Sequence, residues 1–194
     1  MRRFISAAAV GLCLFSASAF AANVLVGSGP DTSYFVLESP NLGVQIYEIR
    51  YTYNASAAQD GYTLLSSVLG ATPSVTVSLT NSGTAAQPNF FVNSFTMNTV
   101  TELNSGPPSY APYWAHWVAG GDAGYPTAVG VPGQAWTFGS GISAPYRAIV
   151  PGSWDALVYS DGTVVPSVMP IPEPSGLLLS LVGALVLLRR KRLS

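Results

Sequence analysis

The sequence predicts an α+β fold: a single, mainly antiparallel β domain with one principal helix, flanked by an N-terminal signal helix and a short C-terminal transmembrane helix. Segments such as residues 43–53 and 74–80 alternate apolar and polar side chains and are rich in β-branched and aromatic residues, which is typical of strands. Residues 55–69 instead carry apolar side chains at helical spacing. Uncharged apolar runs lie near both ends of the chain.

The N-terminus has the three parts of a secretory signal peptide. Two arginines follow the first methionine, residues 4–20 are apolar, and Ala19 and Ala21 form a small-x-small cleavage site. We therefore assign residues 1–21 to a signal peptide. Cys13 is the single cysteine and lies inside this segment, so the mature chain is expected to lack disulfides, cysteine catalysis and cysteine metal sites.

Residues 22–165 are predicted to form one extracytoplasmic β-rich domain, long enough for a hydrophobic core of its own. The run 34–37 suits a short strand, and residues 43–53 form a longer one. Glu48 and Arg50 are two residues apart and therefore face the same way along that strand. They are expected to pair with each other or to flank a partner.

The principal helix is predicted over residues 55–69. Asp60 is a candidate N-cap, or Asn54 if the helix starts earlier, because both side chains accept hydrogen bonds from free backbone amides. Gly70 is the expected end of the helix.

The later strands are shorter and are separated by turns. Residues 74–80 show the cleanest alternation of the chain, a turn follows at 81–83, and 89–101 again has strand character. After a linker at 105–112, rich in glycine, proline and serine, four more strands are expected. They lie at residues 113–118, 134–138, 147–150 and 155–159.

The charge of the predicted domain excludes some functions. Between residues 22 and 165 there are eight carboxylates and only two cations, Arg50 and Arg147, which give a net charge of −6. Such a domain cannot neutralise many phosphates, so nucleic acid is not expected as a partner. One histidine and no mature cysteine are too few ligands for a transition metal, so no metal or cofactor is expected.

The sequence gives little support for catalysis, and no catalytic residue is assigned. Ser109, His116 and Asp122 can be written as a Ser-His-Asp set, but no nucleophile-elbow pattern accompanies them. A structural or surface role for His116 is favoured. The carboxylates could include a glycosidase pair, but their spacing favours solvated surface charge.

The aromatic residues after position 112 allow two interpretations. Tryptophan and tyrosine stack on sugar rings as well as packing a core. A glycan-binding surface requires two or more exposed, coplanar rings, whereas the favoured interpretation is that these rings form the core. The candidates are Tyr113, Trp114, Trp117, Trp136 and Trp154. Strand alternation puts Trp114 and Trp117 on opposite faces, so at least one of them should be buried.

The C-terminal region, residues 166–194, begins with a proline-locked motif at 171–175. Pro172 and Pro174 fix φ and lack an amide proton, so they favour an extended and accessible segment. The motif is therefore suited to the cleft of a processing enzyme.

An apolar segment and a basic tail follow this motif. Residues 175–188 carry no charge and hold seven leucines and two valines. As a helix these residues would span roughly 21 Å, less than the ~30 Å hydrocarbon core, so this transmembrane helix would be short. The tail, 189–194, favours a cytoplasmic end. Its basic residues are Arg189, Arg190, Lys191 and Arg192.

The order of Pro172-Glu173-Pro174, apolar run and basic tail resembles the PEP-CTERM sorting signal of Gram-negative bacteria. The resemblance implies processing near the motif by an inner-membrane exosortase, a transient membrane anchor, and export to the cell surface or the extracellular matrix of bacteria that make exopolysaccharide. Segments such as 91–95 and 113–117 are also similar to an ectodomain that recurs among PEP-CTERM proteins and has no assigned activity.

The expected function is therefore that of an exported, exosortase-sorted surface or matrix protein without catalysis. The first alternative is a carbohydrate-binding module that contacts exopolysaccharide through the aromatic residues. A secreted hydrolase using His116 ranks below both.

Overall fold

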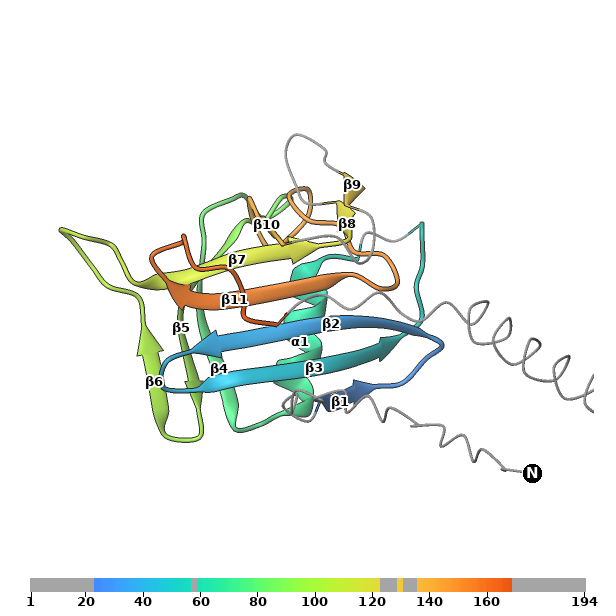
Figure 1. Cartoon of the computed structure of the whole chain (residues 1–194). Helices are drawn as coiled ribbons and strands as arrows, with labels where there is room; N and C mark the ends of the chain where they lie inside the picture. Colours follow the sequence, from blue (N-terminus) through green and yellow to red (C-terminus); the bar gives the residue numbers. More distant parts are fainter. Residues whose placement is uncertain (1–22, 57–58, 123–128, 131–135, 169–194) are drawn as a thin grey trace, which may run out of the picture.

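The computed structural model describes residues 23–56, 59–122, 129–130 and 136–168 (Figure 1). The predicted signal peptide, with Ala19 and Ala21, and the sorting motif, apolar segment and basic tail lie outside these residues. Within the described ranges, no helix is long and apolar enough to cross a membrane.

The described part of the chain is mostly β, so the predicted α+β class is wrong. It contains eleven strands and one helix, α1 (Gly61–Ala71), of 11 residues. The helix was expected from the sequence, but its three turns cover only part of one sheet, and the rest of that face packs on a second sheet (Figure 1). Sheet-on-sheet packing therefore organises this fold.

The larger sheet has six strands and mixes parallel with antiparallel pairs. Its order is β1 (Val24–Gly27), β3 (Gly43–Tyr51), β2 (Asp31–Ser39), β11 (Trp154–Ser160), β7 (Tyr113–Ala119) and β10 (Thr137–Phe138). β1 runs parallel to β3, and β11 runs parallel to β2, while the other three neighbouring pairs are antiparallel. The last long strand, β11, therefore lies in the middle of the sheet, where it separates β2 from β7.

The smaller sheet and the helix lie on one side of the six-stranded sheet. β4 (Val75–Asn81), β5 (Phe90–Met97) and β6 (Val100–Leu103) pair antiparallel in that order. In Figure 1 helix α1 crosses behind β2 and β3. Two short strands, β8 (Gly121–Asp122) and β9 (Val129–Gly130), form a separate pair.

Both faces of the six-stranded sheet carry buried apolar side chains. The inner cluster joins the sheet to α1, β4 and β5, and it includes Phe35, Leu65 and Phe95. The outer cluster lies on the opposite face and includes Trp117 and Trp154. Because both faces of β11 are covered, its residues form the nearly continuous apolar run that is typical of a central strand.

The helix begins where one of the two predicted caps places it. The Asp60 side chain accepts a hydrogen bond from the Thr63 amide at 2.8 Å, and the Thr63 hydroxyl is within 3.4 Å of the Asp60 amide, which together make a capping box. Asn54 instead accepts from the Ser56 amide in a local turn. The helix therefore starts six residues later than predicted and ends at Ala71, one residue beyond Gly70.

Two strand predictions are corrected by backbone interactions that local patterns do not reveal, and one strand was missed. The predicted strand at 89–101 is a hairpin of β5 and β6, which turns at Asn98 with φ of 55°. The segment 147–150 is not a strand, because the Ile149 amide bonds to the Gln59 carbonyl instead of a neighbouring strand. β1 was not predicted.

The proposed pairing of Glu48 with Arg50 is confirmed at 2.6 Å.

Candidate functional site

The most unusual feature of the interior is a buried group of charged side chains. Asp155, on the inner face of β11, and Arg147, in the preceding loop, are both fully buried. Arg147 Nη2 lies 2.7 Å from Asp155 Oδ2, and Arg147 Nε lies 3.1 Å from each carboxylate oxygen. His116 Nε2, on the neighbouring strand β7, lies 2.8 Å from Asp155 Oδ1. We call these three residues the buried charge network.

The guanidinium of Arg147 is held by backbone as well as by the carboxylate. Nη1 donates to the Gly120 carbonyl at 2.6 Å, and Nη2 donates to the Trp154 carbonyl at 3.3 Å. Buried charges persist only when they are paired and hydrogen-bonded. The contacts of Arg147 therefore tie the 143–147 loop to the ends of β7 and β11.

Asp155 also lies against the start of helix α1. A Cβ atom at Gly61, the first helical residue, would come within 2.6 Å of Asp155 Oδ1 and 2.9 Å of the Ile142 carbonyl. Glycine therefore allows this close approach. The positive end of the helix dipole further stabilises the ionised carboxylate.

The surroundings of Asp155 keep it ionised. Burial raises the pKa of this carboxyl, but the positive charge of Arg147 and the hydrogen bond from His116 lower it more, so the net pKa lies below its ordinary value. An ionised carboxylate only accepts hydrogen bonds, so His116 Nε2 carries the proton in this pair.

The lowered pKa of Asp155 predicts a loss of stability in acid. A group whose folded pKa is depressed stabilises the fold above its unfolded pKa, and this contribution is lost as the pH falls through the folded pKa. The free energy of unfolding, measured by urea titration, should therefore decrease below about pH 4. Asp155→Asn should be less stable at pH 7 and should lose less stability between neutral pH and acid. Equal pH dependence in the two proteins would contradict this assignment.

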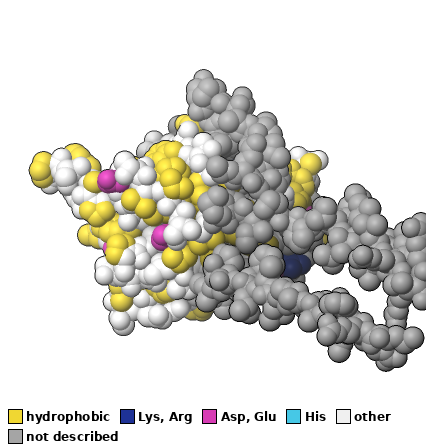
Figure 2. Space-filling model, in the orientation of Figure 1, with side chains coloured by type: hydrophobic (Ala, Val, Ile, Leu, Met, Phe, Trp, Pro, Cys, Tyr) yellow, Lys and Arg dark blue, Asp and Glu magenta, His cyan; other side chains and the backbone are white. Residues whose placement is uncertain are grey.

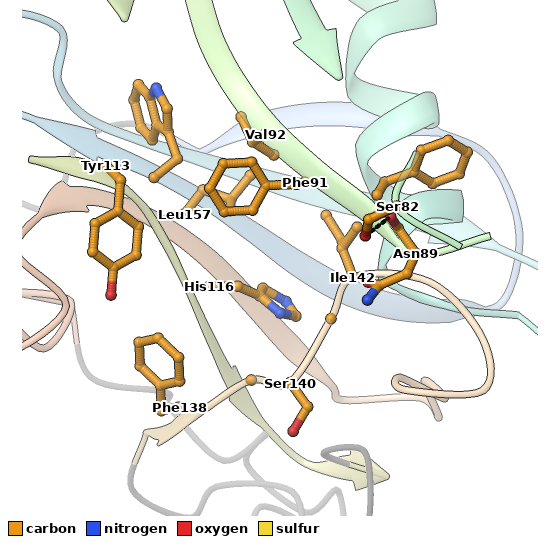
Figure 3. Close-up of a pocket in the computed structure, with 14 residues that line it drawn as sticks. Ser82, Asn89, Phe91, Val92, Tyr113, His116, Phe138, Ser140, Ile142 and Leu157 are labelled. Carbon is orange, nitrogen blue, oxygen red and sulfur yellow. Dashed lines mark hydrogen bonds between the residues drawn. The ribbon is translucent and has the colours of Figure 1, made fainter. Parts of the chain in front are cut away.

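A pocket of about 300 Å³ lies beside the buried charge network, between β5 and the β7–β10 pair. Figure 3 shows the His116 ring on its wall, with Phe91 and Phe138 on either side. The pocket lining contains no Asp, Glu, Lys or Arg among the described residues. We call it the His116 pocket. Its residues are Ser82, Asn89, Phe90, Phe91, Val92, Tyr113, Trp114, His116, Phe138, Gly139, Ser140, Gly141, Ile142 and Leu157.

The second nitrogen of the His116 ring has no hydrogen-bond partner within the described residues. His116 is 8% exposed, and its Nδ1 atom is buried. A Cβ atom at Gly139 would lie 2.3 Å from Nδ1, so only glycine at this position leaves that side of the ring free of a side chain. The Gly139 amide also bonds to the His116 carbonyl at 2.9 Å, which fixes the two residues against each other.

The aromatic residues considered as a glycan surface are separated by the fold. The four tryptophans are only 3% to 8% exposed, and Tyr113 is half-buried. As the alternation predicts, Trp114 faces the inner cluster and Trp117 the outer one. In the outer cluster Trp136 meets Trp154 edge-on, with 84° between the ring planes. The five residues thus do not supply two exposed, coplanar rings.

The residues considered for hydrolysis are not assembled around His116. Its carboxylate partner is Asp155, on another strand, and Ser109 donates its hydroxyl to the Ala111 carbonyl instead. The side chain of Asp122 lies outside the described residues. No serine bonds to the His116 ring in the described structure, and no group of three metal-ligating side chains is found there either.

The sequence-based interpretation missed the burial of Asp155 and Arg147. The carboxylates were interpreted as solvated surface charge, but Asp155 is fully buried and Glu102 is 5% exposed. A signal was present, because Asp155 interrupts the otherwise apolar run from Trp154 to Val158. A lone carboxylate in such a run indicates a buried partner, and the domain offers only two arginines.

Comparison with known proteins finds no matching protein family, no matching curated protein and no matching solved structure.

Proposed function

We propose that this protein is exported across the inner membrane and sorted by an exosortase through its C-terminal signal, and that its β domain acts without catalysis at the cell surface or in the extracellular matrix. The observation that carries the proposal is the order of segments in residues 171–194. A proline-locked motif, an uncharged apolar run and four basic residues follow one another directly.

The contacts at the end of the described chain support release of an intact domain. The Ser167 amide donates to Glu38 Oε2 at 2.8 Å, and the Trp136 indole donates to the Val168 carbonyl at 2.6 Å. Val168 also packs on the outer cluster. Only three residues separate Val168 from Pro172, so the chain can place Pro172 at most roughly 14 Å from Val168. Cleavage at the motif would leave every described strand on the released side.

The character of the surface is consistent with a partner that is not a nucleic acid. On the face shown in Figure 2 the described atoms are mostly hydrophobic or uncharged, with few acidic and basic atoms. Binding to nucleic acid depends on many lysine or arginine contacts with phosphates. Exosortase and, transiently, the inner membrane are the partners proposed for the C-terminal segment, and exopolysaccharide for the β domain.

Replacing the sorting motif is expected to abolish release. A variant with Pro172→Ala, Glu173→Ala and Pro174→Ala keeps the apolar anchor but loses the extended, charged segment that the processing enzyme would bind. In a bacterium with an exosortase, fractionation and immunoblotting should find it uncleaved in the inner membrane.

The matched control for this variant is Pro170→Ala, which removes a proline directly outside the motif and should be processed normally. Normal cleavage and release of the triple variant would refute the sorting proposal. Release of both variants to the same extent would show that the processing enzyme recognises the C-terminal segment without the Pro-Glu-Pro motif.

A further inference from the structure

The chain does not leave the domain where its last strand ends. β11 ends at Ser160, and residues 161–168 return across the outer face of the six-stranded sheet toward β2 (Figure 1). A turn begins this path, in which the Asp161 carboxylate accepts a hydrogen bond from the Thr163 amide at 2.9 Å. We call residues 161–168 the C-terminal strap. It connects the β domain to the segment that carries the sorting motif.

The far end of the strap is fastened to the domain at three neighbouring residues. Pro166 is buried, the Ser167 amide donates to Glu38 Oε2 at 2.8 Å, and the Val168 carbonyl accepts from the Trp136 indole at 2.6 Å. Glu38 lies on β2, 129 positions before its partner, and Trp136 lies directly before β10. Because these partners meet only through the sheet, the strap is fastened only when the domain is folded.

The middle of the strap is packed less tightly than its far end. Val164 is 50% exposed and Val165 is 47% exposed. Val164 also lines a hollow of about 380 Å³, together with residues of β2, β3 and β11. Half-exposed side chains beside a hollow gain little from burial of apolar surface. The contacts at the far end therefore hold the strap, and their loss would free it as far back as β11.

The state of the strap sets how far the sorting motif can extend from the domain. With the strap docked, residues 169–171 separate Val168 from Pro172, and the extended chain spans at most roughly 14 Å. With the strap detached, the spacer begins after Ser160 and spans up to roughly 42 Å. A peptide that binds a cleft in an extended form uses several consecutive residues. The docked strap therefore leaves little chain for a processing enzyme to bind on the domain side of the motif.

We propose that the C-terminal strap restrains processing of the sorting motif, and that Glu38 and Trp136 are the positioning residues that hold it. Cleavage takes place when the strap has detached, so docking keeps the folded domain on its membrane anchor for longer. The inference rests on the proposed sorting function, but docking of the strap is measured without a processing enzyme.

Hydrogen–deuterium exchange of the purified full-length protein in detergent measures the docking. The Ser167 amide should exchange slowly in the wild type, because it is bonded to Glu38. Glu38→Ala removes this acceptor, and Trp136→Phe removes the donor to Val168 but keeps an aromatic ring. Each variant should exchange about fivefold faster in peptides that cover 161–168, since each loses one hydrogen bond. The thermal unfolding temperature checks that both variants remain folded.

Two further variants serve as controls. Glu48→Ala removes a carboxylate from the neighbouring strand β3, where it pairs with Arg50 rather than with the strap, and it should exchange and be processed like the wild type. Glu38→Gln keeps a side-chain oxygen that accepts from the strap, so it should exchange more slowly than Glu38→Ala. Equal exchange in the wild type, Glu38→Ala and Trp136→Phe would overturn the proposal.

Pulse-chase labelling in a bacterium with an exosortase measures the effect on processing. Glu38→Ala and Trp136→Phe should each be released about fivefold faster than the wild type, in step with their faster exchange. If neither variant is released faster, the strap does not restrain processing, and the sorting function still stands. A wild type that stays uncleaved would instead refute the sorting function, and with it a role of the strap in processing, whatever the exchange rates show.

Discussion

Replacing Arg147 with alanine is expected to lower the free energy of unfolding by about 3–5 kcal/mol, because it leaves a buried carboxylate without its charged partner. Asp155 would lose all three short contacts from the guanidinium, and the Gly120 and Trp154 carbonyls would lose a donor. Urea-induced unfolding of the full-length chain at pH 7 measures the effect.

The chain contains its own matched control, a second arginine–carboxylate pair at the surface. Arg50 and Glu48 are 2.6 Å apart, but the Arg50 side chain is 44% exposed. Solvent screens such a pair, so Arg50→Ala should change stability by at most about 1 kcal/mol. If Arg147→Ala costs no more than Arg50→Ala, the buried charge network does not hold the loop to the sheet.

A double variant separates the cost of a missing partner from the value of the ion pair itself. Arg147→Met combined with Asp155→Leu removes both charges and leaves apolar side chains of similar volume. Replacing both members of a buried pair is often neutral, whereas removing one is strongly destabilising. The double variant should therefore be more stable than Arg147→Ala. A double variant as unstable as the single one would show that the backbone contacts of Arg147 carry most of the effect.

Local elements of this fold could be predicted because their signals are local. The alternation in residues 43–53 matches β3, and that in 74–80 matches β4 within one residue at each end. Asp60 was identified as a cap because the side chain of an aspartate is suited to the free amides of a first helical turn, only three residues away.

The arrangement of the strands could not be predicted, because it depends on pairings between distant residues. β11 pairs with β2, which precedes it by more than 110 residues. No pattern within the sequence of β11 indicates that β2 is its neighbour. β1 is four residues long and is recognised only through its parallel pairing with β3. The fold class was wrong for the same reason, since a helix is visible locally but the packing of two sheets is not.

The candidate site shows the same limit. His116 was noticed as the only histidine, yet the carboxylate that binds it lies 39 residues away on β11 rather than at the nearby Asp122. Phe91 and Phe138 were interpreted only as strand residues, since nothing in their own segments indicates that β5 and β10 approach the same pocket. The tryptophans were considered for glycan binding because their flat rings can stack on sugars, but all four are buried and pack in the core.

Trp114→Ala is expected to destabilise the protein by about 3–5 kcal/mol, because this ring joins the two sheets. It meets Phe95 of the smaller sheet edge-on at 4.8 Å and Tyr159 of the larger sheet at 5.3 Å, and its indole donates to the Glu102 carbonyl at 3.1 Å. Trp114→Phe keeps an aromatic ring but leaves that carbonyl without its donor, so it should cost only about 1–3 kcal/mol. Urea unfolding ranks the two variants. If Trp114 instead contacted glycan at the surface, both variants would lose sugar binding at nearly unchanged stability, and the assignment of this ring to the core would have to be abandoned.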